Sequence, residues 1–306
     1  MSPAAPAVLV DGLVKRYGEF VAVDGVSFRV DAGEIFGILG PNGAGKTTTV
    51  EALQGLRTID DGSVSVLGLD PMRQAAQLRR RIGSQLQESA LPDRIKVREA
   101  LDLFSSLSPD GPPVPELLAD WGLDGKANAR FSSLSGGQQQ RLFVALALAN
   151  APDLVFLDEM TTGLDPSSRR VAWDLIRRIR ERGTTVVLVT HFMDEAETLC
   201  DRLVIVDGGM VVADGSPQHL INEHGGGVRV RFTHRGPPLT WLSEIPHVTD
   251  THHDADRYEL TGTGPVLAHV GAALVAHGIE PDDLRQERAT LEEVFLSLTQ
   301  RQRGRV

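Results

Sequence analysis

Apolar positions along the chain fall into short runs and helical repeats. Runs rich in β-branched residues and bounded by glycine predict strands at residues 8–15, 26–30, 34–39 and 64–67. Uninterrupted apolar runs predict two further strands, covered on both faces, at residues 154–157 and 185–190. Apolar spacing and breaker residues predict helices at 46–56, 74–81, 97–107, 116–121 and 167–182. This alternation of strand and helix indicates an α/β sheet.

The composition changes near residues 223–227 (EHGGG), which we take as a domain boundary. Beyond it, Val228, Val230 and Phe232 alternate with arginines and predict a half-exposed strand, with a second strand at residues 257–260. Helical spacing predicts two further apolar helix faces, one with Leu267, Val270 and Leu274, the other with Leu291, Val294, Phe295 and Leu298. We expect a small α/β accessory module over residues 225–306, serving dimerisation or regulation.

Net charge and cysteine content exclude some classes of function and of covalent cross-link. The 31 Lys and Arg against 41 Asp and Glu give a net charge of −10, which argues against non-specific nucleic-acid binding. The single cysteine, Cys200, excludes an intramolecular disulfide and is expected to be a small buried apolar residue. His252 and His253, among three aspartates, are expected in a solvated acidic loop rather than at a metal site.

The sequence predicts no membrane span and no secretion signal. Residues 1–7 are rich in proline and alanine and are expected to be flexible, and residues 1–10 lack a basic and apolar signal pattern. The longest uncharged helical run, residues 142–151, is about half of the ~20 residues that a span requires. A role at a membrane would therefore need a partner.

Residues 40–47 (GPNGAGKT) lie between a predicted strand and a predicted helix. Glycines at 43 and 45 let backbone N–H groups point inward, and the helix N-terminus favours phosphate. Lys46 can then reach the β- and γ-phosphates of a nucleotide, and the Thr47 hydroxyl can bind Mg²⁺. The expected nucleotide-binding residues of this loop are Gly40, Pro41, Asn42, Gly43, Ala44, Gly45, Lys46, Thr47 and Thr48.

Asp158 and Glu159 end the apolar run at residues 154–157. They should therefore lie at the C-terminal edge of a parallel sheet, where open α/β folds place their ligands. Asp158 is expected to bind Mg²⁺, through water, and Glu159 to hold and polarise the attacking water. Phosphoryl transfer depends mainly on such positioning and charge stabilisation.

Five ordered motifs resemble the ATP-binding cassette (ABC) ATPases over about residues 8–222. They are residues 40–47, 134–141 (LSGGQQQR), 154–159, 163–165 and 190–191. The resemblance implies a RecA-like P-loop NTPase core with an antiparallel β edge, over residues 8–224, with a helical subdomain inserted at about 88–150. It also implies a head-to-tail homodimer with ATP and Mg²⁺ between one subunit's phosphate loop and the other's LSGGQ run.

The same resemblance assigns roles outside the phosphate loop. Ser135, Gly136, Gly137 and Gln138 would contact the ATP held by the second subunit, where a glycine-containing helix N-terminus suits phosphate. Asp165 would cross the dimer interface.

Three further residues take roles by resemblance. Tyr17 would stack on adenine, and Gln87 would contact Mg²⁺ or the attacking water and sense the membrane partner. Gln85 lies close by in the sequence, but the spacing from residues 82–83 favours Gln87. His191 would contact the γ-phosphate and orient Glu159 and water.

A narrower resemblance, at residues 82–92, 190–199 and 291–299, is to ATPases of multidrug exporters of the daunorubicin-resistance type. That group pairs the ATPase with a separate transmembrane permease, which implies a cytoplasmic protein held at the inner face of the membrane and export of a drug-like or hydrophobic compound. An importer ATPase, or a soluble ABC ATPase acting on nucleic acid or ribosomes, are the alternatives. The soluble types carry long coiled coils or two cassettes, and neither is visible in this sequence.

Two departures from the family pattern stand out. Met160 replaces the usual proline after the Asp-Glu pair, and we expect a looser turn with slower or more partner-dependent turnover. Residues 88–133 form a short, proline-broken version of the region that meets the permease in the family, so the permease cannot be named from this sequence.

Overall fold

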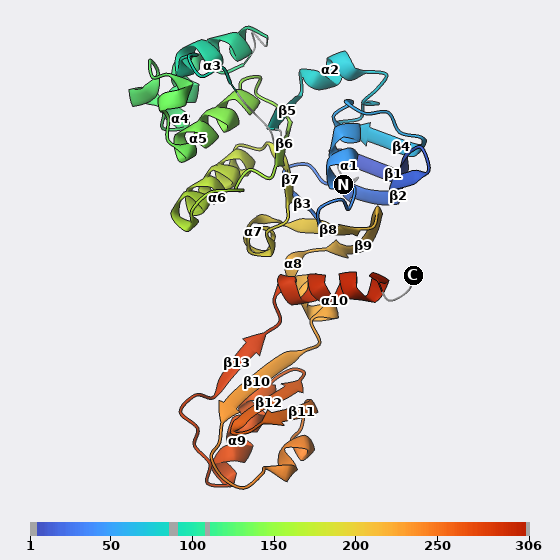
Figure 1. Ribbon diagram of the computed structural model, residues 1–306, viewed down its shortest axis with the longest axis vertical. Coiled ribbons are helices and arrows are strands. Elements are labelled where there is room, and N and C mark those ends of the chain that lie inside the picture. Colours follow the sequence, from blue (N-terminus) through green and yellow to red (C-terminus); the bar gives the residue numbers. More distant parts are fainter. Residues whose placement is uncertain (1–4, 86–90, 108–110, 304–306) are drawn as a thin grey trace. The chain divides into compact units, whose positions relative to one another are not determined.

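A computed structural model describes residues 5–85, 91–107 and 111–303. The chain forms two compact units, residues 1–217 and 218–306 (Figure 1), which we describe separately. The division falls at the start of helix α8 (Pro217–His224), whereas the composition changes at the end of that helix.

A six-stranded sheet forms the centre of the first unit. Its strand order is β5-β6-β7-β3-β8-β9, and every neighbouring pair is parallel except β8 with β9. The strands are β3 (Ile35–Leu39), β5 (Ile82–Gln85), β6 (Leu154–Asp158), β7 (Thr185–Thr190), β8 (Arg202–Asp207) and β9 (Met210–Gly215). All residues of β3, β6 and β7 are buried, as their uninterrupted apolar runs predicted.

An antiparallel sheet with the order β2-β1-β4 adjoins the central sheet. It contains β1 (Val8–Tyr17), β2 (Phe20–Val30) and β4 (Asp61–Val66). Its inward residues share one hydrophobic core with β3 and β6, and the rings of Phe28 and Phe36 stack at 5.4 Å between centroids. The predicted antiparallel β edge is therefore confirmed.

The helices of the first unit pack against different parts of it. Helices α3, α4 and α5 pack on one another and form the inserted helical subdomain (green in Figure 1), whereas α1 packs on the antiparallel sheet. The helices are α1 (Lys46–Leu53), α2 (Ala75–Arg79), α3 (Val97–Ser106), α4 (Val114–Asp120), α5 (Gly136–Ala147), α6 (Pro166–Glu181) and α7 (Met193–Leu199). Short 3-10 turns, η1 (Asp124–Lys126) and η2 (Phe131–Ser133), link α4 to α5.

Helix α4 begins earlier than predicted. Pro113 is its N-cap and Pro115 lies in its first turn, so these prolines start the helix rather than interrupt the chain. Proline is tolerated there because the first N–H groups of a helix have no intrahelical partner.

The second unit contains an antiparallel sheet with the order β11-β12-β10-β13. The strands are β10 (Val228–Thr233), β11 (Val248–Asp254), β12 (Arg257–Gly262) and β13 (Arg285–Arg288), accompanied by η3 (Thr240–Glu244), α9 (Val266–Ala276) and α10 (Leu291–Arg303). Val230 and Phe232 are buried against α9, which contributes Val266, Val270 and Leu274. The expectation of an acidic loop around His252 and His253 was wrong, because these residues belong to the exposed edge strand β11.

The sequence also predicted that Cys200 is buried and that the chain has no membrane-spanning helix. Cys200 is buried directly after α7, and burial raises the pKa of its thiol, which favours the inert thiol form. In the described part of the chain, no helix combines the length and apolar character that crossing a membrane requires.

Candidate functional site

The phosphate loop joins β3 to α1, and backbone atoms of neighbouring segments pack closely against two of its glycines. A Cβ atom at Gly40 would lie 2.2 Å from the Val206 carbonyl oxygen, and one at Gly45 would lie 2.4 Å from that of Ala22. Gly45 also has a φ of 98°, in the left-handed region. Glycine is therefore required at both positions, and the loop delivers the chain directly into the N-terminus of α1, where free N–H groups suit an anion.

Lys46 is the first residue of α1, and its side chain folds back over the loop. The Nζ atom donates hydrogen bonds to the Gly40 carbonyl at 2.9 Å and the Pro41 carbonyl at 3.0 Å. Burial lowers the pKa of the ammonium group, while the carboxylates of Glu159 and Asp158 act in the opposite direction. The loop thus holds one buried cation beside two carboxylates, with the Thr47 side chain exposed next to it.

Asp158 is the last residue of β6 and is buried. Burial, and next the negative charge of Glu159, raise its pKa to about 6, although Lys46 acts to lower it. A divalent cation would relieve this crowding of negative charge, and Mg²⁺ is usually held by one or two carboxylates together with substrate phosphates. The donors present, the Asp158 carboxylate and the hydroxyl of Thr47 in the phosphate loop, fit a metal that the nucleotide phosphates also help to hold. Among the described residues, no cluster of three or more metal-binding side chains exists.

Glu159 follows Asp158 directly in the chain. Its side chain contacts His191, the residue immediately after β7. Oε1 of Glu159 lies 3.1 Å from Nδ1 of His191, and the Glu159 carboxylate is largely buried. The Glu159 backbone has a φ of 48°, a strained value for a non-glycine residue, and its N–H donates to the Val189 carbonyl at 2.9 Å. Strain of this kind persists where the surrounding structure fixes a functional side chain. Met160 next to it is buried, and its effect on turnover stays a prediction.

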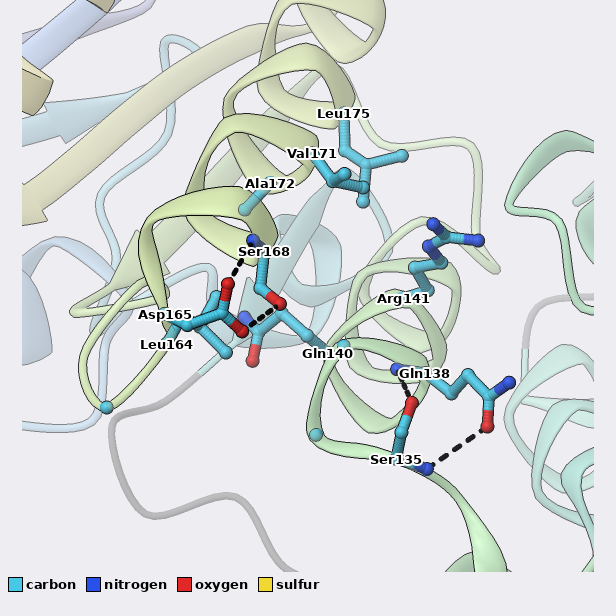
Figure 2. A pocket seen from close by; sticks show the side chains of 13 residues that line it. Ser135, Gln138, Gln140, Arg141, Leu164, Asp165, Ser168, Val171, Ala172 and Leu175 are labelled. Carbon is cyan, nitrogen blue, oxygen red and sulfur yellow. Dashed lines mark hydrogen bonds between the residues drawn. The ribbon is translucent and has the colours of Figure 1, made fainter.

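The LSGGQ run forms the N-terminus of α5. Ser135 is the N-cap and forms a capping box with Gln138: Ser135 Oγ accepts from the Gln138 N–H at 3.4 Å, and the Ser135 N–H donates to Gln138 Oε1 at 3.1 Å. The first turn of α5 faces a cavity of about 410 Å³ that Asp165, Ser168 and Leu175 of the next segment also line (Figure 2). The cavity therefore combines a helix N-terminus with the residues after β6.

Asp165 is the N-cap of α6. Its Oδ1 accepts from the Ser167 hydroxyl at 2.6 Å and from the N–H groups of Ser167 at 2.9 Å and Ser168 at 3.0 Å. Its Oδ2 accepts from Ser168 Oγ at 2.7 Å, and the contacts between Asp165 and Ser168 are drawn in Figure 2. These hydrogen bonds hold the pKa of the carboxyl well below its usual value. Asp165 is therefore a fixed negative charge at the rim of the cavity.

Tyr17 ends β1 and is 43% exposed. Sequence reasoning missed Arg57, whose guanidinium lies 5.4 Å from the centre of the Tyr17 ring and also pairs with Glu51 on α1 at 2.5 Å. An exposed ring supported by cations suits stacking on a base. The sequence offered one weak sign of this role, which is that Arg57 follows the phosphate-loop helix α1 after only a few residues.

One expected residue cannot be placed. Gln87 lies outside the described residues. Gln85, the alternative that we set aside, ends β5 beside Leu157, and its buried Oε1 has no hydrogen-bond partner among the residues that the structure describes.

Comparison with known proteins agrees with this geometry. The ABC transporter family model matches residues 23–162. A Nod factor export ATP-binding protein I of Mesorhizobium japonicum is 40% identical over 98% of this chain and 89% of its own length. The chain belongs to the ABC transporter ATPases. A daunorubicin resistance ATP-binding protein, DrrA3 of Streptomyces coeruleorubidus, is also 40% identical, over 97% of this chain and 96% of its own length.

Solved structures of ABC cassettes share the fold of this ATPase. An ATP-binding subunit of an ABC transporter covers 72% of this chain and 93% of its own chain, with a TM-score of 0.65 and 26% identity. A dimeric cassette bound to ADP and phosphate covers 68% of this chain and 98% of its own, with a TM-score of 0.61 and 28% identity. The RecA-like P-loop fold and the ATPase activity predicted from the motifs are therefore confirmed.

The raised pKa of Asp158 predicts a stability effect. Its folded-state pKa of about 6 exceeds the ordinary 3.8, so the folded protein binds more protons than the unfolded one between these values and its stability falls as pH rises through them. At pH 7.5 without Mg²⁺, the ionised carboxylate should cost about 3 kcal/mol. Asp158→Asn should therefore raise the melting temperature at pH 7.5 and give no gain near pH 3.5, below both values.

Thermal unfolding at the two pH values, without nucleotide or metal, checks this expectation. Asp153→Asn is the matched control, because Asp153 precedes the same strand and its side chain forms an exposed ion pair with Arg81. A gain of equal size at both pH values would show that burial of the Asp158 charge is not the cause.

Proposed function

We propose that this ATPase works as a head-to-tail homodimer that powers the export of a drug-like or hydrophobic compound through a separate transmembrane permease. In the first unit, the phosphate loop belongs to α1 on the antiparallel sheet, whereas the LSGGQ turn belongs to α5 in the helical subdomain (Figure 1). The residues lining the cavity at α5 include none from the phosphate loop. This separation is the observation that carries the proposal, because a second copy would bring the two phosphate-binding elements together.

The proposed mechanism assigns each step to a named group. Lys46 and the N–H groups of the phosphate loop bind the nucleotide phosphates, and Tyr17 stacks on the base. Mg²⁺ held by Thr47 and Asp158, and in our sequence-based expectation also by Gln87, would neutralise phosphate charge. Glu159 accepts a proton from the attacking water, and His191 orients its carboxylate through the 3.1 Å contact. Ser135 and the glycines after it contribute the facing half of the site in the partner copy.

Export is supported by the names of the relatives, which are described as Nod factor export and daunorubicin resistance ATP-binding proteins. A permease partner is supported by exposed apolar side chains around a groove of about 360 Å³. The groove is lined in part by Leu56, Phe104 and Leu107, and Leu107 is 73% exposed. Exposed apolar surface of this kind marks a protein interface. The protein would then lie on the cytoplasmic face of the membrane through its permease.

Affinity purification tests this proposal. Tagged Glu159→Gln protein, recovered with ATP in mild detergent from its native cells, should bring one multi-span membrane protein in stoichiometric amount. Leu107→Asp added to this variant should abolish the recovery without changing ATP binding. Val275→Asp, which alters an exposed apolar residue of α9, is the matched control and should leave recovery unchanged. Recovery of ribosomes, of DNA or of a soluble dimer alone would contradict the proposal.

A further inference from the structure

Glu195 is a buried acidic residue to which the proposed mechanism gives no role. It lies on α7, four residues after His191, and its relative exposure is 0%. Complete burial of a carboxyl group is unfavourable unless specific partners compensate it. The partners of Glu195 therefore indicate what the residue does.

Three segments supply these partners. Trp173 Nε1 of α6 donates to Glu195 Oε1 at 3.0 Å. The hydroxyls of Thr190 and Thr161 also act on the carboxyl and, together with Trp173, lower its pKa, although burial is the larger effect and raises it. Thr190 ends β7 immediately before His191, and Thr161 lies two residues after Glu159. Glu195 is thus shared by the two segments that carry the Glu159–His191 pair.

The contact to Thr161 is incomplete. Oε2 of Glu195 and Oγ1 of Thr161 are both buried, and within the described part of the chain neither makes a hydrogen bond of normal geometry. An unsatisfied buried hydroxyl or carboxyl oxygen is unfavourable, because it has lost its hydrogen bonds to water without replacement. A hydrogen bond between the two groups would satisfy both, and the Thr161 hydroxyl already acts on the carboxyl by lowering its pKa.

We propose that Glu195 is a positioning residue that joins the segment after Glu159 to the segment before His191 and so sets the geometry of this pair for ATP hydrolysis. The inference rests on the proposed roles of Glu159 and His191. Trp173 extends the link to α6, the helix that Asp165 caps. Glu195 touches neither ATP nor water in this scheme, and it acts through the hydrogen bond from Trp173 and the influence of the Thr190 and Thr161 hydroxyls on its carboxyl.

Steady-state ATPase kinetics with separately measured ATP affinity test the proposal. Glu195→Leu keeps the approximate volume but removes both hydrogen-bonding oxygens, and kcat should fall by about tenfold to hundredfold with ATP affinity unchanged. Glu195→Gln can still accept from Trp173 and donate to a threonine hydroxyl, so it should restore most of kcat. Thr161→Val should lower kcat in the same way, and the double variant should be no worse than Glu195→Leu alone.

Thr185→Val is the control for a general loss of stability. Thr185 is a buried threonine at the other end of β7, and its hydroxyl accepts one hydrogen bond, from the Gly33 N–H at 3.0 Å. This variant should unfold at a lower temperature yet keep kcat. Unchanged kcat in Glu195→Leu and Thr161→Val, or an equal loss in Thr185→Val, would overturn the inference. Absence of ATP hydrolysis in the wild-type protein would instead count against the proposed function.

Discussion

Glu159→Gln should lower kcat for ATP hydrolysis by at least about hundredfold, the contribution expected of a general base. ATP binding should persist, because the variant keeps the shape of the side chain and leaves Lys46 and the phosphate loop intact. Since opening of the proposed dimer depends on hydrolysis, the variant should accumulate as an ATP-dependent dimer. Phosphate release, equilibrium nucleotide binding and light scattering measure the three effects.

Two comparisons make this result specific to Glu159. Glu181→Gln alters an exposed carboxyl at the end of α6 and should behave as the wild type. His191→Ala removes the group 3.1 Å from Glu159 Oε1 and should also lower kcat, because the carboxylate loses its orienting partner. Hydrolysis at the wild-type rate in Glu159→Gln would remove Glu159 from its assigned role.

Lys46→Ala should weaken ATP binding by about tenfold to hundredfold. A hydrogen bond to a charged group contributes about 1.5–3 kcal/mol, and tenfold in affinity corresponds to about 1.4 kcal/mol. The substitution also removes the buried cation beside Asp158 and Glu159, so the pKa of Asp158 should rise further. Titration with a fluorescent ATP analogue measures the affinity.

Lys126→Ala is the matched control for this substitution. Lys126 lies in η1 and is exposed, so its loss removes one positive charge without touching the phosphate loop. ATP affinity should stay at the wild-type value. Equal weakening in the two variants would show that net charge, rather than the contact at the loop, controls binding.

Helix ends and exposed strands show where sequence reasoning reached its limit. Helix α1 ends at Leu53 rather than at residue 56, because Gly55 has a φ of 67° and its backbone approaches the Pro71 carbonyl. Strand β11 was missed because almost all of its residues are exposed and polar, so no apolar alternation marks it. Only its pairing with β12 makes it a strand.

The fold class and the identity of the phosphate loop follow from local features of the sequence. Apolar periodicity and the order of short motifs are local properties, and they predicted the buried strands β3, β6 and β7 and the roles of Lys46 and Thr47. The antiparallel edge came from the family resemblance. The order and spacing of the motifs are also sufficient to indicate the ABC ATPase family.

The electrostatics of the site and the pairing of its side chains depend on how the chain folds in three dimensions. The contact of Glu159 with His191, the raised pKa of Asp158 and the burial of Glu195 each depend on segments that are distant in the sequence. Removal from water and proximity to other charges set the properties of these groups, and both follow from how strands and helices pack. The hydrogen bonds around Glu195 could not be inferred from its position in the sequence for this reason.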